Sequence, residues 1–255
     1  MKFSDLAGAI FDVDDTLLDN HPGGGPGLHE RSRVAAAHEA GEKWGIAWLA
    51  GQTYEQAIQA FRTAPVHTLE SCLWNTLKMA GVATDDEPDP NNELFRFLVR
   101  RKNELHEDIL RQDWKEVQGA ISFVALLARR GLRGKLAIAS TAVRRDVSIF
   151  LELSGLRQYF PESHVITKEL FTHAKPHPES FNLAFAALGL PESQRVNVVA
   201  FEDDPRGIMS AKAAGLYVAA ITTRYSREEL AALEVPPNII QDSYADFERQ
   251  LELAA

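Results

Sequence analysis

The spacing of hydrophobic and polar residues divides the chain into two kinds of region. Short apolar runs typical of buried strands occur at residues 9–13, 135–139, 164–167, 196–201 and 217–222. Helical patterns alternate with the later runs, at residues 121–130, 144–154, 180–188 and 207–214, and the tail after 228 is mostly helical. Strands that alternate with helices are typical of parallel sheets. The pattern therefore predicts an α/β fold with a doubly wound parallel sheet, whose last clear strand is 217–222.

A long helical segment interrupts this alternation after the first strand. It begins at His21-Pro22-Gly23-Gly24-Gly25-Pro26-Gly27, a run of residues that break regular structure. Helices are predicted at residues 33–48, 54–62, 66–79 and 94–110. We therefore predict an all-helical domain at 21–111, inserted into an α/β core made of 1–20 and 112–255. A basic run on its last helix predicts a solvent-exposed face, formed by Arg96, Arg100, Arg101 and Lys102.

Composition and charge narrow the classes of partner. The chain has 255 residues, of which 45% are hydrophobic and 25% charged, as in ordinary globular proteins. Its formal net charge of -9 argues against a nucleic-acid partner, which calls for a basic surface. Cys72 is the only cysteine, so an intramolecular disulfide and a cysteine metal cluster are excluded. The sequence shows neither a leader pattern nor a membrane-spanning apolar run, so we expect a cytoplasmic protein without a membrane partner.

Polar residues gather where the predicted strands end. Asp12 and Asp14 follow the first strand, and Ser140 follows the second. Lys175 lies in a later loop, and the pair Glu202-Asp203 ends the strand 196–201. Right-handed crossovers place the carboxyl ends of parallel strands at one edge of the sheet, where ligands bind. Four carboxylates, a hydroxyl and an ammonium group suit a Mg²⁺ ion together with a phosphate.

Each of these residues also has a purely structural interpretation when it is taken alone. The acidic residues after the first strand fit a solvated turn, and Ser140 fits a helix N-cap. Lys175 fits a solvated loop charge, and Glu202, Asp203 and Asp204 fit a loop ahead of a capped helix. Their joint occurrence in this order favours a site.

The same stretches resemble the four motifs of the haloacid dehalogenase-like superfamily, in its phosphatase and β-phosphoglucomutase-like branch with a helical cap. Asp12-Val13-Asp14-Asp15-Thr16 is similar to the first motif, Asp-x-Asp-Gly-Thr, and Ser140 with Thr141 to the second. Lys175-Pro176-His177-Pro178-Glu179 is similar to the third. The fourth is matched by the segment from Phe201 to Gly207 together with Ala213-Ala214-Gly215. The resemblance implies a Rossmann-like core with an inserted helical cap domain.

The resemblance also implies a role for each matching residue. Asp12 is then the nucleophile that forms an aspartyl phosphate, and Asp14 the general acid and base. Ser140, Thr141 and Lys175 hold the phosphoryl oxygens together with Asp12. The Mg²⁺ ligands are the carboxylates of Asp12, Glu202 and Asp203 and the backbone carbonyl of Asp14.

These roles predict a Mg²⁺-dependent phosphatase that acts on a small phosphorylated metabolite. A phosphomutase of the β-phosphoglucomutase type uses the same core motifs and stays open as an alternative. A non-enzyme alternative is a catalytically inactive relative that binds a phosphorylated ligand. Dehalogenase chemistry is disfavoured, because it needs neither Mg²⁺ nor the pair Glu202-Asp203. One residue departs from the motif, since Asp15 stands where the family has glycine. The sequence names neither the substrate nor the oligomeric state.

Overall fold

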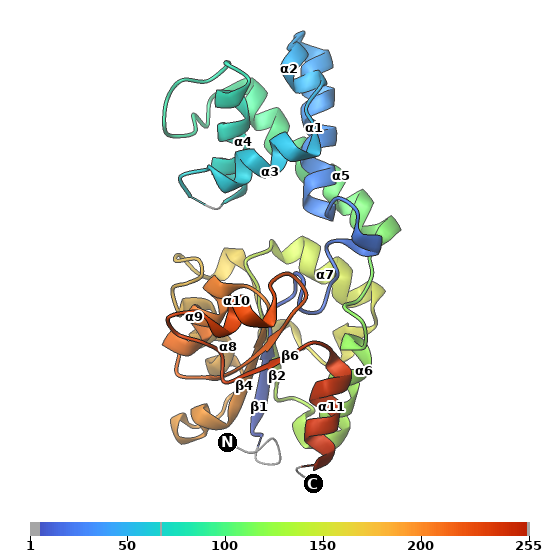
Figure 1. Ribbon diagram of the computed structural model, residues 1–255, viewed down its shortest axis with the longest axis vertical. Helices are drawn as coiled ribbons and strands as arrows, with labels where there is room; N and C mark the ends of the chain where they lie inside the picture. Colours follow the sequence, from blue (N-terminus) through green and yellow to red (C-terminus); the bar gives the residue numbers. More distant parts are fainter. Residues whose placement is uncertain (1–5, 67, 254–255) are drawn as a thin grey trace. The chain divides into compact units, whose positions relative to one another are not determined.

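The structure is a computed structural model that describes residues 6–66 and 68–253 of the chain. Its backbone contacts divide it into two compact units, shown in Figure 1. Unit 1 comprises Met1–Asp19 and Trp114–Ala255, and unit 2 comprises Asn20–Asp113. That the helical segment 21–111 acts as a cap domain stays a prediction.

Unit 1 is built on a six-stranded sheet in which every neighbouring pair of strands is parallel. The strands are β1 (Gly8–Phe11), β2 (Leu136–Ala139), β3 (Val165–Ile166), β4 (Val198–Glu202), β5 (Tyr217–Ile221) and β6 (Ile239–Gln241). Their order across the sheet is β3-β2-β1-β4-β5-β6, the order of a doubly wound Rossmann-type sheet. The predicted fold class, an α/β fold with a parallel doubly wound sheet, is confirmed.

The sequence predicts 217–222 as the last clear strand and a mostly helical tail, but the tail contains one further short strand. The tail contains α10 (Arg227–Ala231), then β6, then α11 (Tyr244–Leu253). β6 pairs with β5 through Ala219 and Ile239. It has only three residues, all of them partly exposed at the sheet edge. An edge strand this short carries too little apolar sequence to be recognised from its pattern.

Helices cover both faces of the sheet (Figure 1). In chain order the remaining helices of unit 1 are α6 (Ala120–Leu127), α7 (Arg144–Leu153), α8 (Glu179–Ala187) and α9 (Pro205–Ala213). α8 and α9 pack on one face, where Phe181 and Ile208 join the core formed by Ile10, Ala137 and Ala200. Since successive strand residues point to opposite faces, the neighbours of these residues serve a second core on the other face.

That second core is aromatic. Phe11 and Phe201, from adjacent strands, stack with ring centroids 4.6 Å apart. Phe123 of α6 lies 5.2 Å from the Phe201 ring, and Phe247 of α11 lies 5.3 Å from it, both edge-on. Such offset or edge-on aromatic contacts add about 0.5–1.5 kcal/mol each beyond the area that they bury. α6 and α11 are thereby fixed to the middle of the sheet.

α11 also contacts the loop that follows β1. Tyr244 is fully buried, and its hydroxyl donates a hydrogen bond to the carbonyl oxygen of Thr16 at 2.9 Å. The final helix therefore helps to hold the polar loop in which the first motif lies.

Unit 2 is all-helical, as the pattern of residues predicts. Its helices are α1 (Leu28–Trp44), α2 (Ala47–Ala50), α3 (Tyr54–Arg62), α4 (Leu69–Met79) and α5 (Glu93–Asp113). Apolar side chains from α1, α4 and α5 form its core, among them Ala36, Leu73 and Leu98.

The predicted exposed basic face on α5 is only partly present. Arg96 and Arg100 are exposed, and Arg101 pairs with Glu39 at 2.5 Å. Lys102, however, is buried with 4% of its surface exposed. It lies one helical turn from the buried Leu98, so it shares the face of α5 that packs inside the unit. The prediction is wrong for Lys102, because a run of charges in sequence visits all sides of a helix.

Among the residues that the structure describes, none of the helices combines the length and the apolar character that crossing a bilayer requires.

Substitution Tyr244→Phe tests the contact between α11 and the loop after β1. We expect the free energy of unfolding to fall by about 1 kcal/mol, because one buried hydrogen bond is lost while the packing of the ring is kept. For a protein of this size the melting temperature then falls by about 2–4 °C. Tyr54→Phe is the matched control, since Tyr54 is 42% exposed. Equal melting temperatures for Tyr244→Phe and the wild type would contradict a stabilising role for this hydrogen bond.

Candidate active site

The candidate site lies where the strand order of the sheet reverses. β1 lies inside the sheet, with β2 and β3 on one side of it and β4, β5 and β6 on the other. Ligands of open α/β sheets bind at such a switch point, beyond the carboxyl ends of the strands. Phe11 pairs with Ile138 of β2 and with Phe201 of β4. The chain therefore leaves β1, β2 and β4 at the same edge of the sheet.

Three carboxylates from β1 and β4 meet at this edge. Asp12, Glu202 and Asp203 each offer an oxygen within 4.8 Å of the others. They are 7%, 1% and 2% exposed, so water screens their charges poorly. At an effective dielectric constant near 20, two such charges 4 Å apart repel by about 4 kcal/mol. The cluster therefore needs a compensating positive charge.

Lys175 supplies part of that charge. Its Nζ donates to Asp12 Oδ1 and to Glu202 Oε1, both at 2.6 Å. Its side chain is 8% exposed, so both ion pairs are shielded from solvent. The third and fourth predicted motifs thus converge on the nucleophile predicted in the first.

The carboxylate of Glu202 is fixed by the chain that follows it. Glu202 Oε2 accepts hydrogen bonds from the backbone N–H groups of Asp203 and Asp204, at 3.1 and 3.2 Å. α9 begins immediately afterwards, with Asp204 as its N-cap and Pro205 in its first turn. Gly207 gives the carboxylate room, since a Cβ atom there would lie 1.8 Å from Glu202 Oε1. The glycine of the fourth motif is therefore required by close approach.

Sequence reasoning gave Thr16 no role, yet the structure places it in the cluster. Its hydroxyl donates to Asp203 Oδ1 at 2.9 Å, and both residues are buried. Because Asp203 has this partner, one of its oxygens is oriented without an added ion. The signal was present in the sequence, as Thr16 is the last residue of the predicted first motif.

The net effect of burial and neighbouring charges is to raise the pKa values of Asp12, Asp203 and Lys175. Desolvation raises the pKa of Asp12, and Glu202 and Asp14 raise it further, although Lys175 opposes them. Desolvation likewise raises the pKa of Asp203, with contributions from Glu202, Asp12 and Asp15. Burial alone lowers the pKa of Lys175, but Asp12 and Glu202 outweigh it, so the net shift is upward. Lys175 is thus held as an ammonium ion.

The cluster has the character of a Mg²⁺ site. Asp12, Glu202 and Asp203 offer only oxygen atoms, which Mg²⁺ prefers. When these carboxylates and Lys175 are all ionised, the four side chains carry a net charge of two negative units, which a divalent ion balances. The raised pKa values of Asp12 and Asp203 also indicate that a cation would stabilise their charged forms. The residues therefore fit the metal.

The other predicted residues, Asp14, Ser140 and Thr141, follow β1 and β2 at the same edge of the sheet. Asp14 is partly exposed and close enough to Asp12 to raise its pKa. Ser140 is buried directly after β2, and its hydroxyl accepts a hydrogen bond from the Ala142 N–H at 3.1 Å. Ser140 does not cap α7, because the N-cap there is Val143. Thr141 is exposed. The roles assigned to these residues stay predictions.

Asp15 is the residue at which the chain departs from the family motif, and its surroundings accommodate the aspartate. Its φ of +55° lies in the left-handed region, where glycine is favoured and aspartate is tolerated. Asp15 is buried and pairs with Arg224 at 3.5 Å, while its carbonyl accepts a hydrogen bond from Thr223 at 2.5 Å. The additional carboxylate therefore has its own cation. Sequence reasoning identified neither Thr223 nor Arg224, since they lie after β5, far from every motif.

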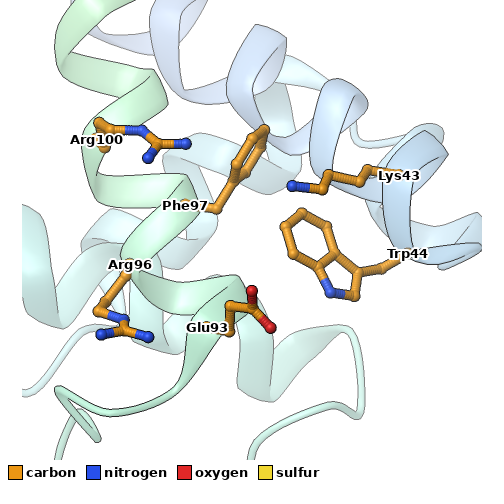
Figure 2. Close-up of a pocket in the computed structure, with 6 residues that line it drawn as sticks. All are labelled: Lys43, Trp44, Glu93, Arg96, Phe97 and Arg100. Atoms are coloured by element: carbon orange, nitrogen blue, oxygen red, sulfur yellow. The ribbon is translucent and has the colours of Figure 1, made fainter.

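Unit 2 contains a cavity of about 410 Å³ that is separate from these residues (Figure 2). It is lined by Lys43, Trp44, Glu93, Arg96, Phe97 and Arg100. The Lys43 ammonium lies 4.4 Å from the Trp44 ring centroid and 4.8 Å from that of Phe97, as in cation–π contacts. None of the predicted site residues lines this cavity.

Comparison with known proteins agrees with this geometry. A family model for haloacid dehalogenase-like hydrolases matches residues 6–215. A phosphoglycolate phosphatase from Salmonella typhi is 27% identical over 249 residues, which cover 96% of this chain and 92% of that protein.

Solved structures share the fold. The structure of CbbY from Rhodobacter sphaeroides in complex with phosphate superposes with a TM-score of 0.69 and 23% identity, covering 96% of this chain and 98% of that one. A candidate β-phosphoglucomutase from Thermotoga maritima has a TM-score of 0.67 and 19% identity, with 96% of each chain covered. At these identities the likeness establishes the fold alone.

Substitution Asp203→Asn tests the repulsion within the cluster. In metal-free protein at pH 7 we expect the free energy of unfolding of Asp203→Asn to exceed that of the wild type by about 1 kcal/mol. The variant is more stable because a buried charge is removed while the acceptor for Thr16 is kept. The melting temperature rises by about 2–4 °C. The raised pKa of Asp203 means that wild-type stability falls as pH rises through it, so the gain disappears toward pH 4. With saturating Mg²⁺ at pH 7, we expect the wild type to have a higher melting temperature than Asp203→Asn.

Asp86→Asn is the control, since the Asp86 side chain is 91% exposed. Thermal melts in a chelator and in Mg²⁺, recorded across this pH range, provide the measurement. A lower melting temperature for Asp203→Asn in chelator at pH 7 would show that the carboxylate is satisfied without a cation.

Substitutions Asp15→Gly and Asp15→Ala separate backbone strain from charge. Both remove the partner of Arg224, but only glycine relieves the strain of a positive φ, which is worth about 1–2 kcal/mol. We therefore expect Asp15→Ala to be less stable than Asp15→Gly by about that amount in denaturant unfolding. Equal stability of the two variants would mean that the backbone rearranges at this position.

Proposed function

Because the chain belongs to the haloacid dehalogenase-like hydrolase family and is a phosphoric monoester hydrolase, we propose that it is a Mg²⁺-dependent phosphatase that forms an aspartyl phosphate on Asp12. The observation that carries the proposal is the contact of Lys175 with both Asp12 and Glu202, at 2.6 Å each. It joins the nucleophile, the phosphate-binding cation and the metal ligands in one buried cluster.

In the first half-reaction a carboxylate oxygen of Asp12 attacks phosphorus, and the bond from phosphorus to the ester oxygen breaks. Asp14 gives a proton to the leaving oxygen, so the alcohol departs neutral. Lys175, Ser140 and Thr141 bind the phosphoryl oxygens and hold them in line for attack. Covalent capture divides one difficult step into two easier ones.

In the second half-reaction Asp14 removes a proton from water, which attacks phosphorus and releases inorganic phosphate. The Asp12 carboxylate is thereby regenerated. Asp12, Glu202, Asp203 and the backbone carbonyl of Asp14 would hold the Mg²⁺ ion, which supplies positive charge against the phosphate. Lys175 adds to this charge because it stays protonated.

We propose a small phosphorylated metabolite as the substrate. Relatives named phosphoglycolate phosphatases make 2-phosphoglycolate the first compound to test. The solved structure of CbbY with bound phosphate supports a phosphate-binding site in this fold. A cytoplasmic location stays a prediction from the sequence.

The experiment measures phosphate release from a panel of phosphorylated metabolites, with Mg²⁺ and with a chelator. Wild-type protein should release phosphate only with the metal, and Asp12→Asn should release none. Brief reaction with a radiolabelled substrate should leave label on the wild type that hydroxylamine removes, as expected for an acyl phosphate. Metal-dependent turnover without any such label, or turnover by Asp12→Asn, would refute the covalent mechanism.

A phosphomutase is the second candidate, favoured by the fold shared with the candidate β-phosphoglucomutase. It would return the phosphoryl group to a second hydroxyl of a sugar instead of to water. Product analysis with a sugar phosphate separates the two, since only hydrolysis yields free phosphate in proportion to substrate consumed. Membership in a hydrolase family favours either enzyme over the inactive ligand-binding relative considered from the sequence.

Substitution Asp14→Asn tests the acid and base. We expect kcat to fall by about 10² to 10⁴, the usual contribution of a positioned acid and base. The fall should be smaller with an aryl phosphate, whose leaving group needs little protonation. Asp19→Asn is the matched control, because Asp19 is a nearby, partly exposed acid outside the motif. Turnover at the wild-type rate in Asp14→Asn would remove Asp14 from the mechanism.

A further inference from the structure

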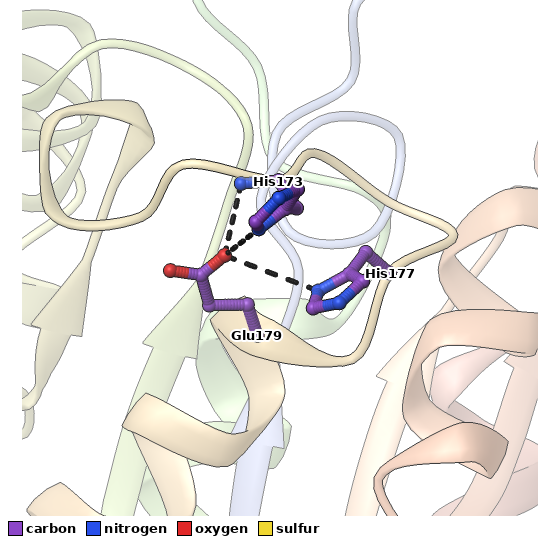
Figure 3. Close-up of side chains that lie close together, drawn as sticks. All are labelled: His173, His177 and Glu179. Atoms are coloured by element: carbon purple, nitrogen blue, oxygen red, sulfur yellow. Dashed lines mark hydrogen bonds and ion pairs between the residues drawn. The ribbon is translucent and has the colours of Figure 1, made fainter.

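A second group of ligating side chains lies beside α8, outside the candidate active site. His173, His177 and Glu179 each offer a ligand atom within 4.8 Å of the others (Figure 3). The two histidine side chains are 64% and 51% exposed, and the glutamate side chain is 28% exposed. All three come from a seven-residue segment within unit 1, so their spacing does not depend on how the two units are arranged.

The carboxylate of this group is held in place by the backbone. Glu179 Oε1 accepts a hydrogen bond from the Thr172 N–H at 3.1 Å, and Oε2 accepts one from the His173 N–H at 2.9 Å. These bonds, with that from the His173 ring, lower the pKa of Glu179 to about 2. The ligand is therefore ionised at neutral pH and oriented before any cation arrives, as metal ligands with outer hydrogen bonds usually are.

Both imidazole rings face the same carboxylate oxygen. His173 Nδ1 lies 2.9 Å from Glu179 Oε2, and His177 Nδ1 lies 3.9 Å from it. The ring centroids are 4.5 Å apart. Ligand atoms about 2.0–2.1 Å from a tetrahedral Zn²⁺ lie about 3.3 Å from one another, between these two distances. Shifts of about 0.4 and 0.6 Å would bring these two distances to that value, and exposed side chains can move by this much.

From this geometry we propose that His173, His177 and Glu179 bind a transition-metal ion of the Zn²⁺ class at the surface of unit 1. Two imidazole nitrogens and one carboxylate suit Zn²⁺, Ni²⁺ or Co²⁺, whereas Mg²⁺ prefers oxygen ligands alone. The exposed side of the group leaves further coordination positions to water. This site therefore selects a cation different from that of the cluster around Asp12.

The proposed site lies in the same loop as Lys175. Lys175 lies between His173 and His177 in the chain, and its ammonium contacts Asp12 and Glu202. An ion bound by the two histidines and Glu179 cross-links the chain on both sides of Lys175. The backbone that presents this lysine is then restrained.

Calorimetric titration of the full chain with Zn²⁺ tests the proposal, with Mg²⁺ present in excess throughout. We expect one Zn²⁺ site in the wild type and a loss of affinity of at least about tenfold in His173→Ala and in His177→Ala. Co²⁺ should give a visible absorption spectrum with the wild type that both variants weaken. His38→Ala is the matched control, because His38 belongs to neither group of potential metal ligands. The readout is binding, so it holds whether or not the chain is a phosphatase.

Asp203→Asn is the second control, since Zn²⁺ also binds carboxylates. The histidine site predicts that this variant keeps the calorimetric Zn²⁺ site. Loss of the site in Asp203→Asn would assign it to the Asp12 cluster and overturn the proposal. Undiminished affinity in both histidine variants, shown by circular dichroism to be folded, would overturn it too.

Discussion

Three carboxylates share one edge of the sheet in this chain, and the ammonium group of Lys175 is what makes that arrangement tenable. It contacts Asp12 and Glu202 at 2.6 Å each, in surroundings where water screens little. Without it, mutual repulsion would favour opening of the loops or protonation of the acids. One ammonium group leaves two of the three negative charges uncompensated, and burial, with smaller contributions from neighbouring carboxylates, raises the pKa values of Asp12 and Asp203. The remaining charge is what suits the site to a divalent ion and, with that ion, to a phosphate.

The scaffold holds this unfavourable charge density through apolar packing around it. Phe11 directly precedes Asp12, and Phe201 directly precedes Glu202. Their rings stack on each other on one face of the sheet. Phe123 of α6 and Phe247 of α11 pack edge-on against Phe201. Tyr244 then links α11 to the loop after β1 through Thr16, whose own hydroxyl holds Asp203. Tyr244 and Thr16 therefore connect the aromatic core to the charged cluster. The free energy gained by packing the core offsets the repulsion within the cluster.

Lys175 belongs to one group of potential metal ligands by contact and lies next to a second group in the chain, and the two groups differ in chemistry. The cluster around Asp12 is buried and made of oxygen donors, whereas the group around His173 is exposed and contains two nitrogens. Oxygen donors alone favour hard cations such as Mg²⁺, whereas nitrogen donors favour borderline cations such as Zn²⁺. The net charge of -9 does not forbid an anionic substrate, because local cations such as Lys175 decide the field within a few ångströms.

The sequence by itself predicted the parallel α/β fold and four side chains of the cluster, Asp12, Lys175, Glu202 and Asp203, because apolar runs and the polar residues that follow them are local signals and occur in the order of the four motifs. It could not reveal β6, whose three half-exposed residues carry little apolar pattern, or the burial of Lys102, which depends on the face of α5 that packs. The pairing of Asp15 with Arg224 and the support of Thr16 by Tyr244 join residues more than 200 positions apart. Only the tertiary structure decides such contacts, since they arise where strand ends and distant loops converge.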